Sequence, residues 1–571
     1  MTFSFVSTLP PWLTYTEGEA PLVLIAPHGG RRPADAPILD NIKVNDLYTA
    51  ELTTLLAART RSYAFINHSH DRNELDLNRI SQVRARAPWL LTALTELLST
   101  LVERYGAARV FFLHGWNVVQ PVCDVGVGCK QRDGHVVPVG KATPTLSADF
   151  LTTALLPFRA AALLQGIDVA FGRRYPAADK DNLMQVFSAR FVQDSSASLR
   201  TLAELATQGK VDAVQLELGV GLRWPGSERE RFIEVFCQTL GTDVPCIRER
   251  GQPFSAVSLA SSSSTIIPQQ NGAPLSLPHM PELTRVGLHF HDPASGLGVI
   301  GGIECDRAAP TCAGRLLLSL GGSEMALFTG EDDALPHTGK VQVGGFVWQS
   351  QPDGLMISYR GTVMRFCHPQ AFIRLEDGLA ASWIEPAEVT LRLTLPQTLS
   401  PPPLPLFLSH LQGEVRLRDG LRAVDAWGFL DTLPSEETGR LLPRRLLSLP
   451  FGSDLGIFLS SVEMPDGLRS SGIVYYQGAQ YPLRPGDWQL HYTFAQGRPT
   501  GFRFVLTPTA PLTLQCSGET LTAIPIVRHA PTGSALTVTF GLARTLWQGR
   551  QACGVYEVSE WRRDSDALGV K

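Results

Sequence analysis

Polar side chains that could bind a metal follow or lie within three apolar stretches of this sequence. His28 ends "PLVLIAPH", His114 ends "VFFLH", and Glu217 lies within "VQLEL". Each stretch has the length and apolar character of a buried strand. Two histidines and a carboxylate are the chemical inventory of a hydrolytic zinc site, in which a further position is left to water. The three residues therefore predict a metal-dependent hydrolytic site, provided that the fold brings them together.

Each of these residues also has a structural interpretation. His28 could be a turn histidine that shares hydrogen bonds with its own loop, and His114 could be a satisfied core histidine. A carboxylate in a buried strand is costly unless it is paired or functional, and Arg223 is a candidate ion-pair partner for Glu217. The residue types alone leave both interpretations open.

Two further groups of potential ligands are interpreted as loops. We interpret the stretch "NHSHDRNE", with His68, His70 and Asp71, mainly as loop residues rather than as ligands. The stretch "CDVGVGCKQRDGH", with Cys123 and Cys129, fits the mobile rim of a site better than a structural metal site.

Strands and helices alternate over residues 1–250, which we expect to form one domain. Strands are expected at 21–30, 62–69, 108–117, 167–174 and 212–221, and helices at 45–61, 81–107, 147–166 and 226–241. This alternation is typical of a layered α/β domain with a largely parallel sheet. Ligands of such sheets bind outside the carboxyl ends of the strands, where His28, His114 and Glu217 could converge.

The chain changes character after residue 250. Residues 251–280 are rich in Ser, Pro, Gln and Gly and indicate a linker. Residues 281–571 contain short alternating runs separated by Gly, Pro and Asp turns. They predict an all-β region, either one large or two smaller antiparallel barrels or sandwiches.

Composition excludes several classes of protein. The 571 residues carry a formal net charge of −4 without a basic block, so no nucleic-acid partner is expected. No apolar run is long enough to span a bilayer, and the first 20 residues lack the basic start of a secretory signal. Nine scattered cysteines favour a reduced, cytoplasmic setting. Neither a "G-x-S-x-G" nucleophile elbow nor a phosphate-binding glycine motif occurs.

Four motifs in a fixed order resemble one known family. The motifs "PHGG", "LDLNR", a histidine that closes an apolar strand, and "QLEL" are together similar to the N-formylglutamate amidohydrolase family, over roughly residues 15–245. That family shares its fold with the zinc carboxypeptidases. The resemblance implies a three-layer, zinc-exopeptidase-like domain with a mixed, mostly parallel sheet and one zinc ion. It also implies hydrolysis of a C–N bond in an N-acyl amino acid or small peptide that bears a free carboxylate.

The resemblance also implies roles for individual residues. His28 and His114 would bind zinc, and Glu217 would be the general base that takes a proton from the attacking water. Relatives carry an acid two positions before the second histidine, whereas this chain has Phe112 there. Since such an acid orients the imidazole, the ring of His114 must find a carbonyl or a water instead.

Substrate binding would fall to Asn78 and Arg79 of the "LDLNR" motif, which match the pair that holds the substrate carboxylate. The planar guanidinium of an arginine can bind a carboxylate through two hydrogen bonds. Arg79 could instead form a surface salt bridge with Asp76 or Glu74. We also place Arg223 in the substrate-binding group, because an arginine could stabilise the developing oxyanion.

The third metal ligand departs from the related pattern. Zinc carboxypeptidases use His-x-x-Glu, but the residue three positions after His28 is Arg31. We therefore expect the carboxylate ligand to come from Asp46, with Asp35 and Asp40 as alternatives. Asp46 could equally be the N-cap of the helix that follows it.

The β-rich half carries a shorter resemblance. The stretches "LHFHDPASGLGVIGGIECDRAAPTCAGRLLLSL" and "VDAWGFLD" are similar to lipocalin-like proteins grouped with the AttH and carotenoid hydratase families. Such proteins are built from paired β-barrels or sandwiches with an apolar pocket, so an apolar ligand is implied here. His289 and His291 alternate along one strand and would share a face. The alternative function is therefore a non-catalytic binding protein, in which Arg31 and Phe112 mark a degenerate hydrolase domain.

Overall fold

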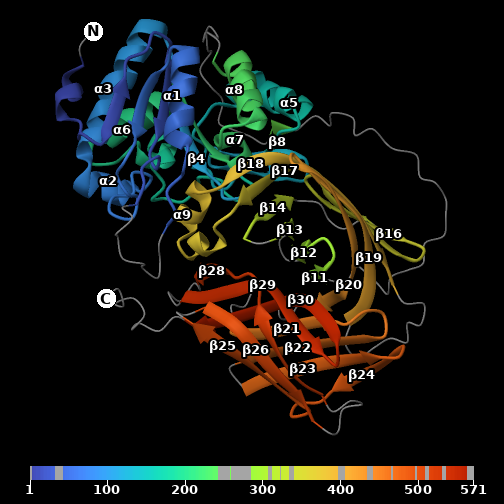
Figure 1. Cartoon of the computed structure of the whole chain (residues 1–571). Helices are drawn as coiled ribbons and strands as arrows, with labels where there is room; N and C mark the ends of the chain where they lie inside the picture. Colours follow the sequence, from blue (N-terminus) through green and yellow to red (C-terminus); the bar gives the residue numbers. More distant parts are fainter. Residues whose placement is uncertain are drawn as a thin grey trace. The chain divides into compact units, whose positions relative to one another are not determined.

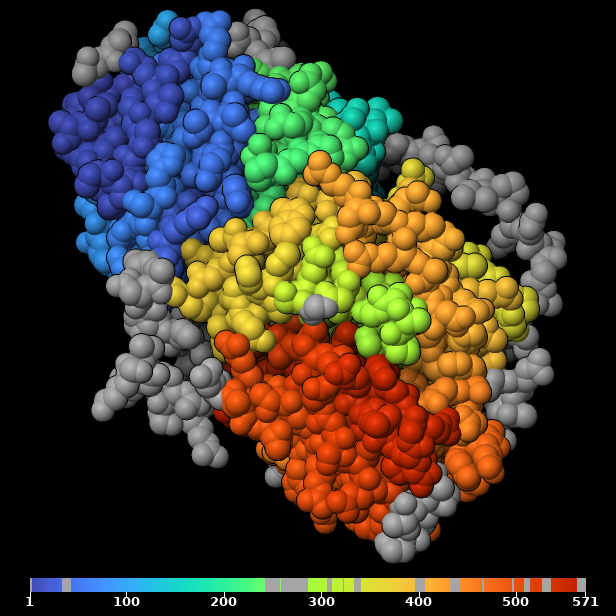
Figure 2. Space-filling view, in the orientation of Figure 1, coloured from blue at the N-terminus to red at the C-terminus, as the bar shows by residue number. Residues whose placement is uncertain are grey.

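The computed structural model describes two compact units of the chain. Of the described residues, those from 3 to 32 and from 43 to 258 belong to one unit, and those from 285 to 561 belong to the other. The described residues are 3–32, 43–241, 257–258, 285–306, 311–321, 323–332, 340–395, 406–433, 442–464, 467–495, 498–507, 514–529 and 535–561. Figure 2 shows each unit built from one block of the sequence, blue to green for the first and lime to red for the second. The linker expected at 251–280 lies outside the described residues, apart from 257–258.

A mixed sheet of seven strands forms the centre of the first unit. Its strands are β1 (Leu13–Thr16), β2 (Leu22–Ala26), β3 (Tyr63–Asn67), β4 (Ala108–Gly115), β5 (Val122–Gly126), β8 (Asp168–Phe171) and β9 (Val211–Leu218). They are arranged in the order β1-β3-β2-β4-β9-β5-β8. The pairs β3–β2, β2–β4, β4–β9 and β5–β8 are parallel, whereas β1–β3 and β9–β5 are antiparallel. The expected largely parallel α/β sheet is confirmed.

Helices cover both faces of this sheet, as Figure 1 shows. The helices are α1 (Thr49–Thr60), α2 (Ile80–Arg86), α3 (Pro88–Tyr105), α4 (Ala148–Phe150), α5 (Leu156–Leu164), α6 (Ala197–Thr207), α7 (Val220–Arg223) and α8 (Ser227–Thr239), with the short helical turns η1 (Ser4–Thr8), η2 (Leu151–Leu155), η3 (Leu183–Phe187) and η4 (Ala189–Phe191). Helices α1, α5 and α8 pack on one face, and α2, α3 and α6 pack on the other. In β2, Leu22 and Leu24 face the first layer while Val23 and Ile25 face the second, because successive side chains alternate.

Two local expectations in this unit are wrong. The single helix expected at 81–107 is divided into α2 and α3 at Pro88, which begins α3 because proline has no N–H group to donate inside a helix. The region of Cys123 and Cys129, expected to be a loop, instead forms strands. Cys123 lies in β5, and Cys129 begins a small sheet of β6 (Cys129–Arg132), β7 (His135–Pro138) and β10 (Val257–Ser258).

The second unit contains two antiparallel sheets, as expected for an all-β region. The first comprises β11 (Arg285–His291), β12 (Gly298–Asp306), β13 (Thr311–Ser319), β14 (Met325–Asp332), β15 (Lys340–Val343), β16 (Phe346–Gln351), β17 (Gly354–Phe366), β18 (Trp383–Thr394), β19 (Leu406–Leu417) and β20 (Gly420–Leu433). Its path β14-β13-β12-β11-β20-β19-β18-β17 closes on itself because β14 also pairs with β17. These eight strands form a barrel, which β16 and β15 extend at β17. The short helices η6 (Pro369–Ile373) and α9 (Leu375–Ala380) precede β18.

The other sheet of this unit stays open, as a half-barrel. It comprises β21 (Arg444–Pro450), β22 (Leu455–Met464), β23 (Gly467–Tyr476), β24 (Ala479–Leu483), β25 (Trp488–Ala495), β26 (Arg498–Leu506), β27 (Leu514–Thr520), β28 (Ile524–His529), β29 (Ala535–Trp547) and β30 (Arg550–Trp561). An apolar cluster joins it to the closed barrel and includes Phe429 and Phe458. Cys305 and Cys312 form a disulfide between the paired strands β12 and β13.

No helix in the described parts of either unit combines the length and the apolar character needed to cross a membrane.

Candidate metal centre

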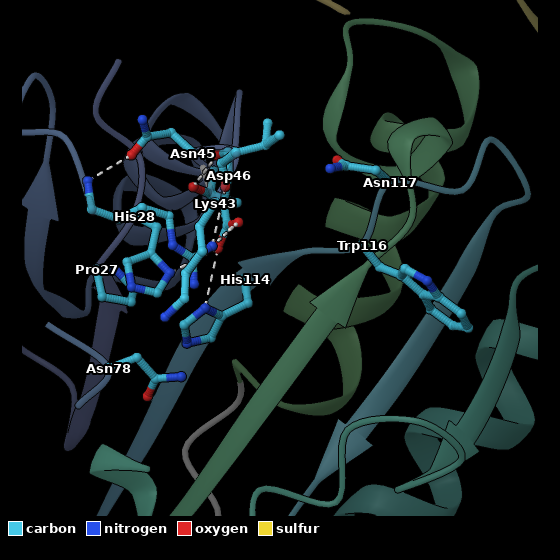
Figure 3. Close-up of polar contacts among 12 residues, drawn as sticks. Pro27, His28, Lys43, Asn45, Asp46, Asn78, His114, Trp116 and Asn117 are labelled. Carbon is cyan, nitrogen blue, oxygen red and sulfur yellow. Dashed lines mark hydrogen bonds and ion pairs between the residues drawn. The ribbon is translucent and has the colours of Figure 1, made fainter. Parts of the chain in front are cut away.

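Two histidines and one aspartate meet at the carboxyl edge of the sheet in the first unit. His28 lies two residues beyond the end of β2, and His114 lies near the end of the neighbouring parallel strand β4. The Asp46 Oδ2 atom lies 3.2 Å from His28 Nδ1 and 3.1 Å from His114 Nδ1. The exposed fractions of the three side chains are 0% for His28, 4% for Asp46 and 2% for His114. Figure 3 shows both imidazoles beside Asp46, so the three groups expected to bind a metal do come together.

Asp46 reaches this position from the segment that precedes α1, and it does not cap that helix. The N-cap of α1 is Tyr48, which has a positive φ and makes no side-chain capping bond. The backbone N–H of Asp46 donates to the His28 carbonyl at 2.8 Å, and the Asp46 carbonyl accepts from Thr49. The capping interpretation of Asp46 is therefore wrong, since its carboxylate faces the histidines. The alternative ligands Asp35 and Asp40 lie outside the described residues.

Asp76 orients the imidazole of His28. Its Oδ1 atom lies 2.7 Å from His28 Nε2, the ring nitrogen that faces away from Asp46. The same oxygen accepts from the backbone N–H of Asn78, and Oδ2 accepts from Lys43 Nζ at 2.8 Å. A carboxylate on the second nitrogen of a histidine fixes the ring and its tautomer, as in many metal sites. The sequence prediction did not include this role, although Asp76 is the acid of the "DLNR" motif.

The sequence prediction also did not include Arg72, which contacts the expected metal ligand Asp46 directly. Its Nη1 atom donates to Asp46 Oδ1 at 3.1 Å. Burial alone would raise the pKa of Asp46, but Arg72 and the two histidines hold it well below its usual range. The pKa of Asp76 is likewise lowered, against burial, by His28, Arg72 and Lys43. Both carboxylates are therefore anionic, which is the form that binds a cation.

Glu217 lies beside His114 in the sheet. The two residues are register partners in the parallel pair of β4 and β9, so their side chains emerge on the same face. The Glu217 carboxylate is buried and accepts a hydrogen bond from Gln215 Nε2 at 2.8 Å. Burial is the largest influence and raises the pKa of Glu217 to about 7, while the nearby charge of Asp46 also raises it and His114 opposes the increase. A carboxyl group with such a pKa can accept and release a proton near neutral pH.

The three predicted substrate-binding residues differ in their surroundings. The backbone N–H of Asn78, a residue labelled in Figure 3, donates to Asp76 Oδ1 at 3.0 Å. Its buried side-chain Oδ1 atom has no hydrogen-bond partner within the described ranges. The Arg79 side chain is 39% exposed, and its closest acids, Asp76 and Asp179, lie 3.9 Å away. The salt bridge with Asp76 that the sequence allowed is therefore found, and carboxylate binding by Arg79 stays a prediction.

Arg223, by contrast, forms hydrogen bonds that connect separate segments of the fold. It is fully buried, and it donates to the backbone carbonyls of Leu47, Trp116 and Leu218 and to Asn117 Oδ1. These bonds connect the segment of Asp46 to the ends of β4 and β9. These hydrogen bonds give the guanidinium a structural role, and substrate binding by Arg223 stays a prediction. Nor do the described contacts include a hydrogen bond or ion pair between Arg223 and Glu217.

His114 is oriented less firmly than His28. Phe112, two residues earlier, is packed in the apolar layer on the same face of β4, so it offers no acid to the ring. The Nε2 atom of His114 is buried and has no hydrogen-bond partner among the described residues. The carbonyl that was expected to orient this ring is not found in that part of the chain.

The donor set fits a metal ion. One ligand atom from each of His28, Asp46 and His114 lies within 4.8 Å of the others. Two imidazole nitrogens and a carboxylate oxygen suit zinc, and three protein ligands leave room for water or substrate. The remaining histidines of the loop, His68 and His70, stay outside this group, and His70 instead stacks on Trp12 at 4.5 Å.

Comparisons with known proteins give the following likenesses. No family model matches the chain, and no curated protein matches it. The solved structure of N-formylglutamate amidohydrolase from Ralstonia eutropha JMP134 is similar over 40% of this chain and 96% of that chain, with 16% identity and a TM-score of 0.26. A protein of Nitrosomonas europaea assigned as AttH is similar over 52% of this chain and 100% of that chain, with 12% identity and a TM-score of 0.35. The two solved structures belong to the same two groups as the sequence resemblances.

Proposed function

We propose that the first unit is a zinc-dependent hydrolase of a C–N bond, with His28, Asp46 and His114 as the zinc ligands. The observation that carries the proposal is the convergence of two buried imidazoles, those of His28 and His114, on one carboxylate oxygen of Asp46. Glu217 lies on the strand next to His114. When bound, zinc supplies a Lewis acid that polarises a carbonyl group and lowers the pKa of water.

Glu217 is the proposed general base. It takes a proton from the attacking water and delivers it to the leaving nitrogen, so that the amine departs neutral. Its position as the register partner of His114 supports this role, and so does its burial, which keeps the carboxyl group from being strongly acidic. Gln215 restrains the carboxylate through one oxygen and leaves the other for the proton transfer.

The proposed substrate is an N-acyl amino acid or a small peptide with a free carboxylate. Arg79 and Asn78 would hold that carboxylate, Arg79 through its partly exposed guanidinium and Asn78 through the N–H groups of its side-chain amide. Lys43 and Arg72 offset the negative charges of Asp76 and Asp46 at the same edge of the sheet. A bound zinc ion together with Arg79 would then leave net positive charge there, so an anionic substrate is favoured over a cationic one.

The test is hydrolysis by the zinc-loaded protein. We expect it to release the free amino acid from N-formyl amino acids, and we expect prior removal of the metal with a chelator to abolish the release. The Glu217→Gln variant should retain its zinc and lose about 10²–10⁴-fold in kcat, the usual contribution of a general base. Glu204→Gln, a matched substitution on α6, is the control and should retain full activity. A zinc-loaded protein that is inactive on a panel of N-acyl amino acids and small peptides would overturn the proposal.

A second candidate is a binding protein whose hydrolase unit has lost catalysis. The observation that favours it is the buried Nε2 atom of His114, which has no hydrogen-bond partner among the described residues, together with Phe112 in the place of an acid. In that case the protein would bind an N-acyl amino acid without turnover, and Glu217→Gln would leave the affinity for that ligand unchanged. Calorimetric titration with an N-acyl amino acid distinguishes the two candidates.

A further inference from the structure

Four side chains of the candidate metal centre close a ring. Arg72 Nη1 bonds Asp46 Oδ1 at 3.1 Å, and Asp46 Oδ2 contacts His28 Nδ1 at 3.2 Å. On the other side of the imidazole, His28 Nε2 contacts Asp76 Oδ1 at 2.7 Å. The remaining oxygen, Asp76 Oδ2, lies 3.9 Å from Arg72 Nη2 and completes the ring. One guanidinium therefore faces both the expected ligand and the residue that orients His28.

The ring assigns each carboxylate oxygen to one kind of partner. In Asp46, Oδ2 faces the two imidazoles and Oδ1 faces Arg72. In Asp76, Oδ1 faces His28, and Oδ2 faces the cations Lys43 and Arg72. A carboxylate that is free to rotate could offer either oxygen, or both, to a metal ion. The bond from Arg72 restricts Asp46 to one.

Arg72 is itself held in place by the segment that carries Asp46. Its backbone N–H donates to Asn45 Oδ1 at 3.0 Å, and its Nη1 atom also donates to the Val44 carbonyl at 3.2 Å. Asn45 Nδ2 in turn donates to Asp71 Oδ1 at 3.0 Å. Four hydrogen bonds thus connect residues 44–46 with residues 71–72. Only 18% of the Arg72 side chain is exposed.

We propose that Arg72 is the positioning residue of the metal centre: it holds Asp46 as a ligand through one oxygen and ties it to the Asp76–His28 pair. This inference rests on the proposed function, because it takes His28, Asp46 and His114 as the metal ligands. Residues that orient metal ligands typically contribute 10–100-fold to metal affinity.

Whether removal of Arg72 weakens or strengthens metal binding distinguishes a positioning role from a purely electrostatic one. A guanidinium beside a metal ion repels it, so the loss of an arginine should strengthen metal binding if charge were its only contribution. Positioning predicts the reverse, since removal of Arg72 frees Asp46 to rotate. Arg79 offers a matched control because it is also cationic and lies 3.9 Å from Asp76, but it makes no contact with Asp46 among the described residues.

The experiment measures zinc affinity and the visible spectrum of the Co²⁺-loaded protein in the full chain. Arg72→Ala should weaken zinc binding about 10–100-fold, and the intensity of its Co²⁺ bands should change because Asp46 is free to offer two oxygens. Arg72→Lys keeps the charge but cannot span both carboxylates, so its affinity should fall between those of Arg72→Ala and the wild type. Arg79→Ala should bind zinc at least as tightly as the wild type, with the same Co²⁺ spectrum.

Each outcome decides the inference. Unchanged or tighter zinc binding by Arg72→Ala, with wild-type Co²⁺ bands, overturns it, even if the wild type hydrolyses N-acyl amino acids. A wild-type protein that binds no zinc overturns both this inference and the proposed function. If Arg72→Ala does not fold, Arg72→Lys decides: weakened zinc binding with an altered Co²⁺ spectrum supports positioning, and wild-type behaviour contradicts it.

Discussion

The two units each bury a pair of histidines, and the surroundings of the two pairs differ. In the first unit, His28 and His114 share one oxygen of Asp46 at 3.1–3.2 Å. In the second, His289 and His291 lie two residues apart on β11, and His289 Nε2 is 3.4 Å from Asp431 Oδ1. The ring of His289 meets the edge of Phe458, and Gly287 leaves the space that Asp431 fills.

This difference shows that burial of a histidine does not by itself identify a site. In the first unit, the carboxylates of Asp46 and Asp76 contact the imidazoles, and Arg72 and Lys43 contact those carboxylates. Burial of charged groups costs free energy unless they are paired, so an arrangement of this kind is typical of a functional site. In the second, Phe429 and Phe458 form the apolar cluster that joins the closed barrel to the half-barrel, and His289 lies against it. We interpret the first pair as functional and the second as part of the packing between the two sheets.

The largest expected effect is a complete loss of metal binding, which should distinguish the two pairs of histidines. We expect the wild type to bind one zinc ion per chain and His28→Ala to bind none. Because an ion that binds only the folded state stabilises it, saturation at 100-fold over the dissociation constant adds about 2.7 kcal/mol to the free energy of unfolding, and His28→Ala should lose this gain. Elemental analysis and thermal unfolding with and without zinc measure both quantities.

His289→Ala is the matched control for that comparison. It should keep one zinc ion per chain and the full zinc-dependent stabilisation, although it removes a buried imidazole from the second unit. Loss of zinc from His289→Ala, or its retention by His28→Ala, would contradict the distinction between the two pairs.

The sequence predicted the parts of the site that follow directly from strands. His28, His114 and Glu217 could be found because each ends or interrupts an apolar run, and parallel strands bring their carboxyl ends to one edge. Asp46 required the resemblance, since an aspartate before a helix is more often a cap. Asp76 and Arg72 were not predicted because they act across separations of 48 and 26 residues, through loops that have no periodic pattern.

The β-rich half shows a similar division. Alternating apolar residues predicted antiparallel strands, and these strands are found. The closure of one sheet by β14 and β17, and the open edge of the other, depend on register, which side-chain alternation leaves undetermined. The interaction of His289 with Asp431 also depends on register, because β11 and β20 are far apart in the sequence.

A large change in stability should follow from truncation of the apolar cluster in the second unit. Phe429 is fully buried, and it packs with Leu408, Phe458 and Tyr475. Phe429→Ala should lower the free energy of unfolding by about 3–5 kcal/mol, the usual cost of a cavity of that size in a core. Urea denaturation of the full chain measures the loss, and zinc stoichiometry should stay unchanged. A loss of less than about 1 kcal/mol would show that the cluster does not hold the two sheets together.

The smallest expected effect is a pH dependence that originates in His291. Burial lowers the pKa of this imidazole below its ordinary value of 6.5, and the charge of Arg544 acts in the same direction while Asp292 opposes it. As the pH falls through 6.5, the unfolded chain therefore takes up a proton at this residue before the folded chain does. The wild type should lose stability from that pH downward, by about 1.4 kcal/mol for each unit by which the folded pKa is lowered.

His291→Asn tests this linkage because asparagine cannot take up the proton. The free energy of unfolding, measured by urea denaturation at pH 7.5 and at pH 5.5, should fall less between the two values in the variant than in the wild type. Arg544→Ala should also reduce the loss, by a smaller amount, because it removes a charge that disfavours the protonated ring while burial remains. Equal losses in the wild type and in His291→Asn would mean that His291 is protonated as readily in the folded chain as in the unfolded one.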